Sequence, residues 1–156
     1  LYFSAINKGE RSMKRNLHPE SLTLSDFTGS ESFYPFTITN SVLTEGTKYV
    51  AEELGAYWLM EKIDLTVREL VKSKKLFSPE LGWFGSGGIA VANLKPANSN
   101  GAKLTIEDGN YNVLVEDHIE FTDLDFERID KYNPPELTIW VSPNGQGLTL
   151  YLPSER

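Results

Sequence analysis

The sequence predicts an α+β fold in which one helical layer, a long or kinked helix, packs on a four- to five-stranded antiparallel sheet built from hairpins. Apolar residues recur at helical spacing between Thr44 and Lys72, and from residue 89 onward they alternate with polar residues, as in strands. Turn signals such as Asp108-Gly109-Asn110 separate the alternating segments, so consecutive strands are expected to pair as hairpins.

The helical segment carries its own start and stop signals. Thr44 is predicted to be the N-cap, with Glu45 in the first turn, where a carboxylate meets the positive end of the helix dipole. The apolar stripe runs to about Lys72, and Pro79 prevents continuation. Gly55 lies inside the stripe and costs about 1 kcal/mol relative to alanine. It therefore predicts a kink, a break between two helices or a close backbone approach.

The strand segments are short and follow one another closely. A second hairpin is predicted at Asn144-Gly145, and a charged connection at 122–135 ends in two prolines. Because the strands are consecutive, the sheet should be antiparallel with the helix on one face. The predicted strands are residues 89–94, 104–106, 112–121, 137–141 and 148–152.

The domain organisation is predicted to be simple. Leu1-Tyr2-Phe3-Ser4 resembles the remnant of an engineered protease-cleavage tag, and the first methionine is Met13. Residues 1–12 are therefore expected to be a tag remnant, and residues 13–156 a single α+β domain. At 156 residues the chain is long enough to bury a core without metals or disulfides.

Composition limits the functions that the chain can have. The sequence has no cysteine, which excludes disulfides and thiolate nucleophiles and fits a reducing compartment, so a cytoplasmic location is expected. No run of about eighteen apolar residues exists that could span a membrane. A net charge of −7 repels nucleic-acid phosphates and disfavours direct nucleic-acid binding, but it is compatible with docking on a basic protein surface.

The densest polar stretch offers a candidate metal site. Glu116, His118 and Glu120 share one face of the predicted strand. Carboxylates with one imidazole suit manganese, iron or zinc, although three such residues in a row span too far for one ion without a bulge. The competing interpretation is the solvent face of a half-buried strand. With Asp123 added, the stretch gives an alternative function, a small metal-dependent hydrolase.

A second candidate site consists of large aromatic side chains. These residues would contact a ligand or partner, because Trp and Tyr are favoured where a partner buries a surface. Aromatic residues at helical spacing also serve as core, so both interpretations stay open. The candidates are Tyr57, Trp58, Trp83 and Trp140.

Five segments, taken together, form a recognisable series: Thr44–Glu52, Gly55–Leu59, Glu107–Asn110, Ile119–Asp123 and Leu152–Glu155. In order and approximate spacing they resemble the family of unknown function DUF6876. The resemblance implies an accessory protein of bacterial mobile elements, such as plasmids and phages. It implies no catalytic residues and no cofactor.

No arrangement of residues in the sequence amounts to a catalytic motif, and no catalytic residue or cofactor is assigned. The favoured interpretation is a non-enzymatic interaction or modulator protein whose partner is another protein. A homo-oligomer is also compatible with the sequence. The alternatives are the metal-dependent hydrolase and a small-ligand binder that uses Tyr57, Trp58 and Trp140. An interaction protein should expose an apolar or aromatic patch rimmed by acids.

Overall fold

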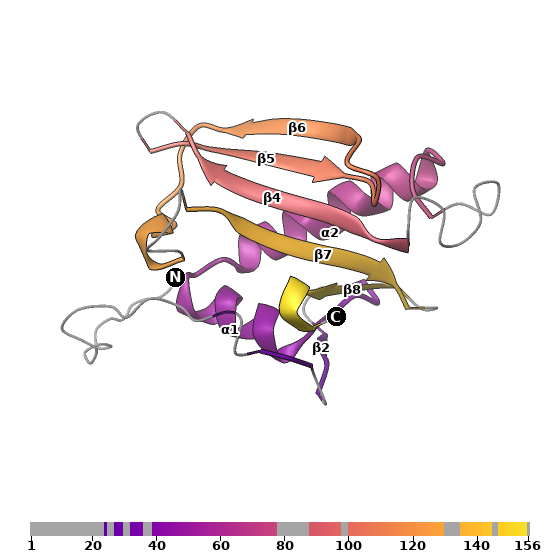
Figure 1. Cartoon of the computed structure of the whole chain (residues 1–156), viewed down its shortest axis with the longest axis horizontal. Helices are drawn as coiled ribbons and strands as arrows, with labels where there is room; N and C mark the ends of the chain where they lie inside the picture. Colours follow the sequence, from indigo (N-terminus) through magenta and orange to yellow (C-terminus); the bar gives the residue numbers. More distant parts are fainter. Residues whose placement is uncertain are drawn as a thin grey trace.

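The computed structural model describes residues 24, 27–29, 32–35, 39–77, 88–97, 100–129, 135–144 and 147–155. In this part of the chain the fold is α+β, with helices α1 (Glu45–Glu53) and α2 (Tyr57–Lys72) and one seven-stranded sheet (Figure 1). Two short 3-10 turns, η5 (Phe126–Arg128) and η6 (Pro153–Glu155), complete it. The predicted tag remnant and Trp83 lie outside the described residues.

The sheet is larger than predicted and is mixed. Its order is β2-β3-β8-β7-β4-β5-β6, and every neighbouring pair is antiparallel except β3 and β8, which run parallel. The predicted α+β class is confirmed, whereas the prediction of four to five strands, all antiparallel, is wrong: the described residues form seven strands, and one pair, β3 and β8, is parallel. The strands are β2 (Tyr34–Pro35), β3 (Val42–Leu43), β4 (Ala90–Pro96), β5 (Ala102–Glu107), β6 (Val113–Ile119), β7 (Leu137–Pro143) and β8 (Leu148–Tyr151).

The missed strands, β2 and β3, have two residues each, too few to show an alternating pattern in the sequence. Both predicted hairpins are confirmed, since β5 pairs with β6 and β7 pairs with β8. Strand β4 also extends beyond the predicted strand 89–94, because Pro96 still belongs to it and pairs with Ala102.

The helical prediction is confirmed as two helices with a break. Thr44 caps α1 through a reciprocal capping box with Thr47, in which each side-chain oxygen accepts a hydrogen bond from the other residue's backbone N–H. Gly55 has a φ of +61°, the left-handed conformation that glycine adopts without a Cβ penalty. The chain turns there, and the backbone N–H of Ala56 donates to Ala51 O at 2.8 Å.

Both helices lie on one face of the sheet. Along β4, β5 and β7 every second side chain is buried, and the buried set packs with the apolar stripe of α2. Figure 1 shows α2 running behind these strands. On the opposite face, called the open face below, no helix of the described residues covers the sheet, and side chains such as Val91, Asn93 and Trp140 are half-buried. Within the described residues no helix is long and apolar enough to cross a membrane.

Candidate functional site

The open face of β6 carries two of the three predicted metal ligands. Glu116 and His118 lie there side by side, with 4.0 Å between Glu116 Oε1 and His118 Nε2. Glu116 also forms an ion pair with Lys103 Nζ on β5 at 3.0 Å. The hydrogen bond from Lys103, followed by its charge, holds the pKa of Glu116 below its ordinary value. The carboxylate is therefore held by a lysine.

Glu120, the third predicted ligand, lies beyond the end of β6 and is exposed. Asp117 alternates with Glu116 and His118, points to the helical side and forms an ion pair with Lys62 of α2 at 2.6 Å. In the described part of the chain, no group of three or more His, Cys, Asp or Glu side chains is arranged to hold a metal ion.

The predicted aromatic residues do not form one surface. Tyr57, at the start of α2, is exposed, and partial burial, followed by the charge of Glu52, raises its pKa. Trp58 packs against the core on the helical side. Trp140 lies on the open face, where its ring meets that of Tyr151 edge-on with 6.1 Å between centroids. The sheet thus separates Trp140 from Tyr57 and Trp58.

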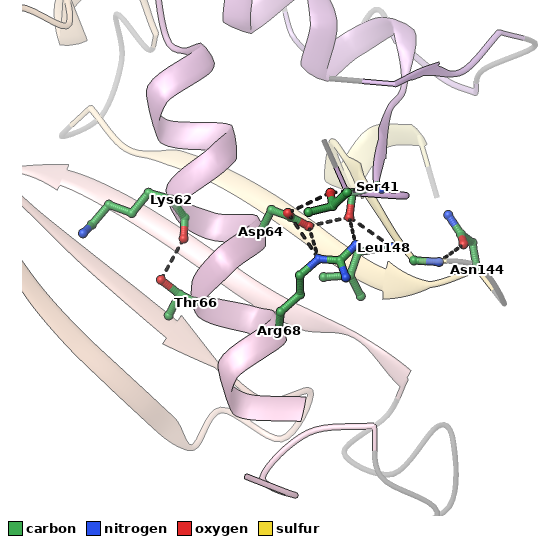
Figure 2. A network of polar contacts seen from close by, with 9 residues as sticks. Ser41, Lys62, Asp64, Thr66, Arg68, Asn144 and Leu148 are labelled. Atoms are coloured by element: carbon green, nitrogen blue, oxygen red, sulfur yellow. Dashed lines mark hydrogen bonds and ion pairs between the residues drawn. The ribbon is translucent and has the colours of Figure 1, made fainter. Parts of the chain in front are cut away.

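A buried polar network that the sequence did not reveal joins α2 to the β7–β8 hairpin (Figure 2). Asp64 is fully buried, and its carboxylate accepts hydrogen bonds from the hydroxyls of Ser41 and Thr39. Arg68, one turn later on α2, donates from Nε to both Asp64 oxygens, at 3.2 and 3.3 Å. Ser41 Oγ in turn accepts hydrogen bonds from Arg68 Nη2 at 2.8 Å and from the backbone N–H of Leu148 at 3.3 Å.

This network connects three segments that are far apart in the sequence. Without Asp64, the hydroxyl of the fully buried Ser41 would lose its acceptor, and the partly exposed Arg68 would lose its ion-pair partner. Its residues already satisfy one another, so the network is best explained as structural. The sequence signal was weak, because an aspartate and an arginine four apart on a helix usually form a surface pair.

A second cluster of hydrogen bonds caps the N-terminus of α1. One carboxylate oxygen of Glu155 accepts hydrogen bonds from Thr44 Oγ1 at 2.6 Å and from Leu152 N at 2.8 Å. The other accepts from the backbone N–H of Gly46 at 3.0 Å. A carboxylate satisfies the free N–H groups of a helix N-terminus and is stabilised by the helix dipole. The Leu152–Glu155 segment thus acts as an anchor for the first helix.

The turn between β5 and β6 is held by Asp108. Its carboxylate accepts hydrogen bonds from the backbone N–H groups of Asn110 and Asn112, at 2.8 and 3.0 Å, and from the Asn112 side chain at 2.9 Å. Burial opposes ionisation of Asp108, but these hydrogen bonds outweigh it and lower the pKa of Asp108. The turn therefore holds the start of β6 in place next to the end of β5.

Strand β6 is the last strand of the sheet order, so only one of its edges has a partner among the described strands. Exposed apolar side chains lie at both of its ends. Tyr111 is 87 % exposed and Val113 56 % exposed at the start, and Phe121 is 68 % exposed just beyond the end. Carboxylates lie along and after the strand, at Glu116, Asp117, Glu120 and Asp123.

The β6 edge, meaning residues 111–121 below, thus combines exposed apolar side chains, acidic neighbours and a main chain that can accept another strand. Only its carboxylates and histidine had been singled out from the sequence. That β6 lies at the end of the sheet depends on strand order, which the sequence does not reveal.

Comparison with known proteins places the chain in a family. Residues 20–156 match the family model described as "Family of unknown function (DUF6876)", so the chain belongs to that family and the predicted resemblance is confirmed. No curated protein and no solved structure matches it.

Proposed function

We propose that this DUF6876 member is a non-enzymatic protein-interaction protein, and that the β6 edge is its contact surface. A single observation carries the proposal: the terminal strand of the sheet is flanked by large exposed apolar side chains, Tyr111, Val113 and Phe121. Soluble proteins usually protect such an edge by covering, twisting or shortening it. Apolar side chains that remain exposed beside an edge mark it as a place for a partner.

Strand addition is the binding mode that suits this surface. An extended segment of the partner would hydrogen bond to the N–H and C=O groups on the edge of β6 that no described strand pairs with, and its side chains would cover the apolar residues at the ends. The bulge between β5 and β6, at Ile106/Glu107, increases the local twist, so a twisted strand would fit better than a flat one.

The charges near the edge support a polypeptide partner. The net charge of −7 and the carboxylates along β6 repel phosphates, which argues against nucleic acid. Glu116 and Asp117 are each held by a lysine, Lys103 and Lys62, which supports a structural role for them over a role as free catalytic acids.

The proposed biological setting follows from the sequence. Because the family resemblance implies mobile elements, we propose that the protein serves a plasmid or phage by binding a polypeptide at the β6 edge. Because the sequence contains no cysteine, the cytoplasm is the proposed compartment.

The test is capture of partners by the tagged chain from a lysate of its native host, with identification by mass spectrometry. One polypeptide should be recovered in stoichiometric amount. Phe121→Lys, which places a charge at the edge, should abolish recovery. Leu65→Lys, at an exposed apolar position on α2, is the matched control and should retain it. A Glu116→Gln/Glu120→Gln variant tests the contribution of the acids.

Two results would contradict the proposal. Either the wild-type chain captures nothing, or Phe121→Lys and Leu65→Lys reduce capture equally. Metal analysis and ligand screening would then test the hydrolase and ligand-binder alternatives.

A further inference from the structure

We propose that the polypeptide that fits the β6 edge is a second copy of this chain, added antiparallel with Asp117 on the two-fold axis. This inference rests on the proposed function and names its partner. Two copies related by a two-fold axis present the same surface to each other, so each residue of β6 must match its counterpart on an identical strand.

The two faces of β6 limit the registers that are allowed. Val115 and Ile119 pack against the margin of the core, and Asp117 reaches Lys62 of α2, so these side chains lie on the helical side. Glu116 and His118 lie on the open face. Directly opposed residues of antiparallel strands share a face, so a residue of one set must oppose a residue of the same set.

With Asp117 on the axis, the pairs on either side of Asp117 in the regular part of the strand are compatible. Val115 opposes Ile119 on the helical side, which extends the apolar layer that each copy leaves half-covered. Glu116 opposes His118 twice on the open face, where the imidazole can donate to the carboxylate. Asp117 opposes its own copy, and each of the two carboxylates has its own Lys62 at 2.6 Å.

The exposed apolar side chains at the two ends of β6 lie outside this regular ladder, since the bulge at Ile106/Glu107 comes before Val115 and Phe121 follows the end of the strand. Because the copies are antiparallel, the end that carries Val113 in one copy lies next to the end that carries Phe121 in the other. In the described part of the chain these side chains are 56 % and 68 % exposed, so association would cover apolar surface at both ends. The result is one sheet that continues through both copies, with the helices of both on the same side.

Neighbouring registers are incompatible. An axis at Glu116 would oppose the apolar Val115 with the carboxylate of Asp117 at two symmetry-related positions. An axis at His118 would oppose Asp117 with Ile119 and Glu116 with Glu120. Each places like charges, or a charge and an apolar side chain, directly opposite one another, which destabilises a strand pair. Charges that usually protect an edge against pairing here select one register.

A charge exchange tests both the partner and the register. In His118→Glu, two pairs become Glu opposite Glu, and in Glu116→Lys, two pairs become Lys opposite His. Sedimentation equilibrium of the full chain should show a wild-type dimer and, for each variant, a dissociation constant at least about tenfold higher, because two symmetry-related pairs change together. An equimolar mixture of the variants should dimerise again, because the introduced lysine of one chain then opposes the introduced glutamate of the other.

The controls separate association from folding. Glu69→Lys reverses a charge on the exposed side of α2 and should leave the dimer unchanged. Circular dichroism checks that each variant is folded. In the unmodified protein, amide hydrogen exchange of peptides covering residues 113–121 should slow as protein concentration rises, which tests the edge without any substitution.

The inference is overturned if the wild-type chain is monomeric, if the dimer is insensitive to both variants, or if the mixture does not restore association. A monomer that still captures a different polypeptide, with loss in Phe121→Lys, would overturn the second copy and keep the proposed function. A monomer that captures nothing would overturn both.

Discussion

Replacement of Asp64 by alanine is expected to lower the free energy of unfolding by about 3 kcal/mol, because it removes one partner of a buried ion pair. Asp64 is 0 % exposed and accepts hydrogen bonds from Ser41, Thr39 and Arg68. Losses for such a change reach about 5 kcal/mol when the remaining charge is fully buried. Here the Arg68 side chain is 35 % exposed and can regain water, so the lower figure applies.

The assay is urea unfolding followed by tryptophan fluorescence, with the free energy obtained by linear extrapolation. Glu61→Ala is the matched control, since Glu61 is an exposed acid on the same helix and its loss should change stability by less than about 0.5 kcal/mol. A double-mutant cycle with Arg68→Ala should give a coupling energy of about 1 kcal/mol or more. If Asp64→Ala falls within about 1 kcal/mol of Glu61→Ala, the buried network is not a stabilising feature and the reasoning is wrong.

Three further predictions concern single residues, each measured by urea unfolding. Glu155→Gln should cost about 1 kcal/mol, because a charged acceptor is lost at the N-terminus of α1. Gly147→Ala should cost about 1–3 kcal/mol, because a Cβ there would lie 2.5 Å from a backbone oxygen, whereas Gly29→Ala, with open space around it, should be nearly neutral. The pKa of Asp108 is lowered in the fold, so its stabilisation is present above about pH 4 and is lost as pH falls through the lowered pKa. The stability difference between wild type and Asp108→Ala should therefore shrink on acidification, and a constant difference would contradict this assignment.

Local patterns in the sequence predicted most of the fold. The cap at Thr44, the break at Gly55 and both hairpins are confirmed, because each depends on residues that are close in the sequence. Strand β3 could not be predicted in this way, since its two residues pair in parallel with β8 about a hundred positions later. Strand β3 is held in place by tertiary contacts, because the neighbouring Ser41 side chain hydrogen bonds to Leu148 N and to Asp64.

The candidate surface was predicted only in part. The alternation of Glu116, Asp117 and His118 correctly placed Glu116 and His118 on one face of a strand, but sequence spacing did not show that lysines hold Glu116 and Asp117. The importance of Phe121 depends on its exposure at the sheet's end. Exposure and strand order are both properties of the assembled sheet, so no local pattern could reveal them.

The two ends of the sheet differ in how their strands are held. At one end the short strand β2 pairs with β3, and β3 has only two residues in register with β8. Side chains next to β3 hold it in place: Leu148 N donates to Ser41 Oγ, and Thr47 Oγ1 donates to Leu150 O at 2.8 Å. At the β6 end, the described residues provide only the pairing with β5. Changes at Asp64 or Glu155 should therefore affect unfolding without altering association, whereas changes at Glu116 or His118 should affect association first.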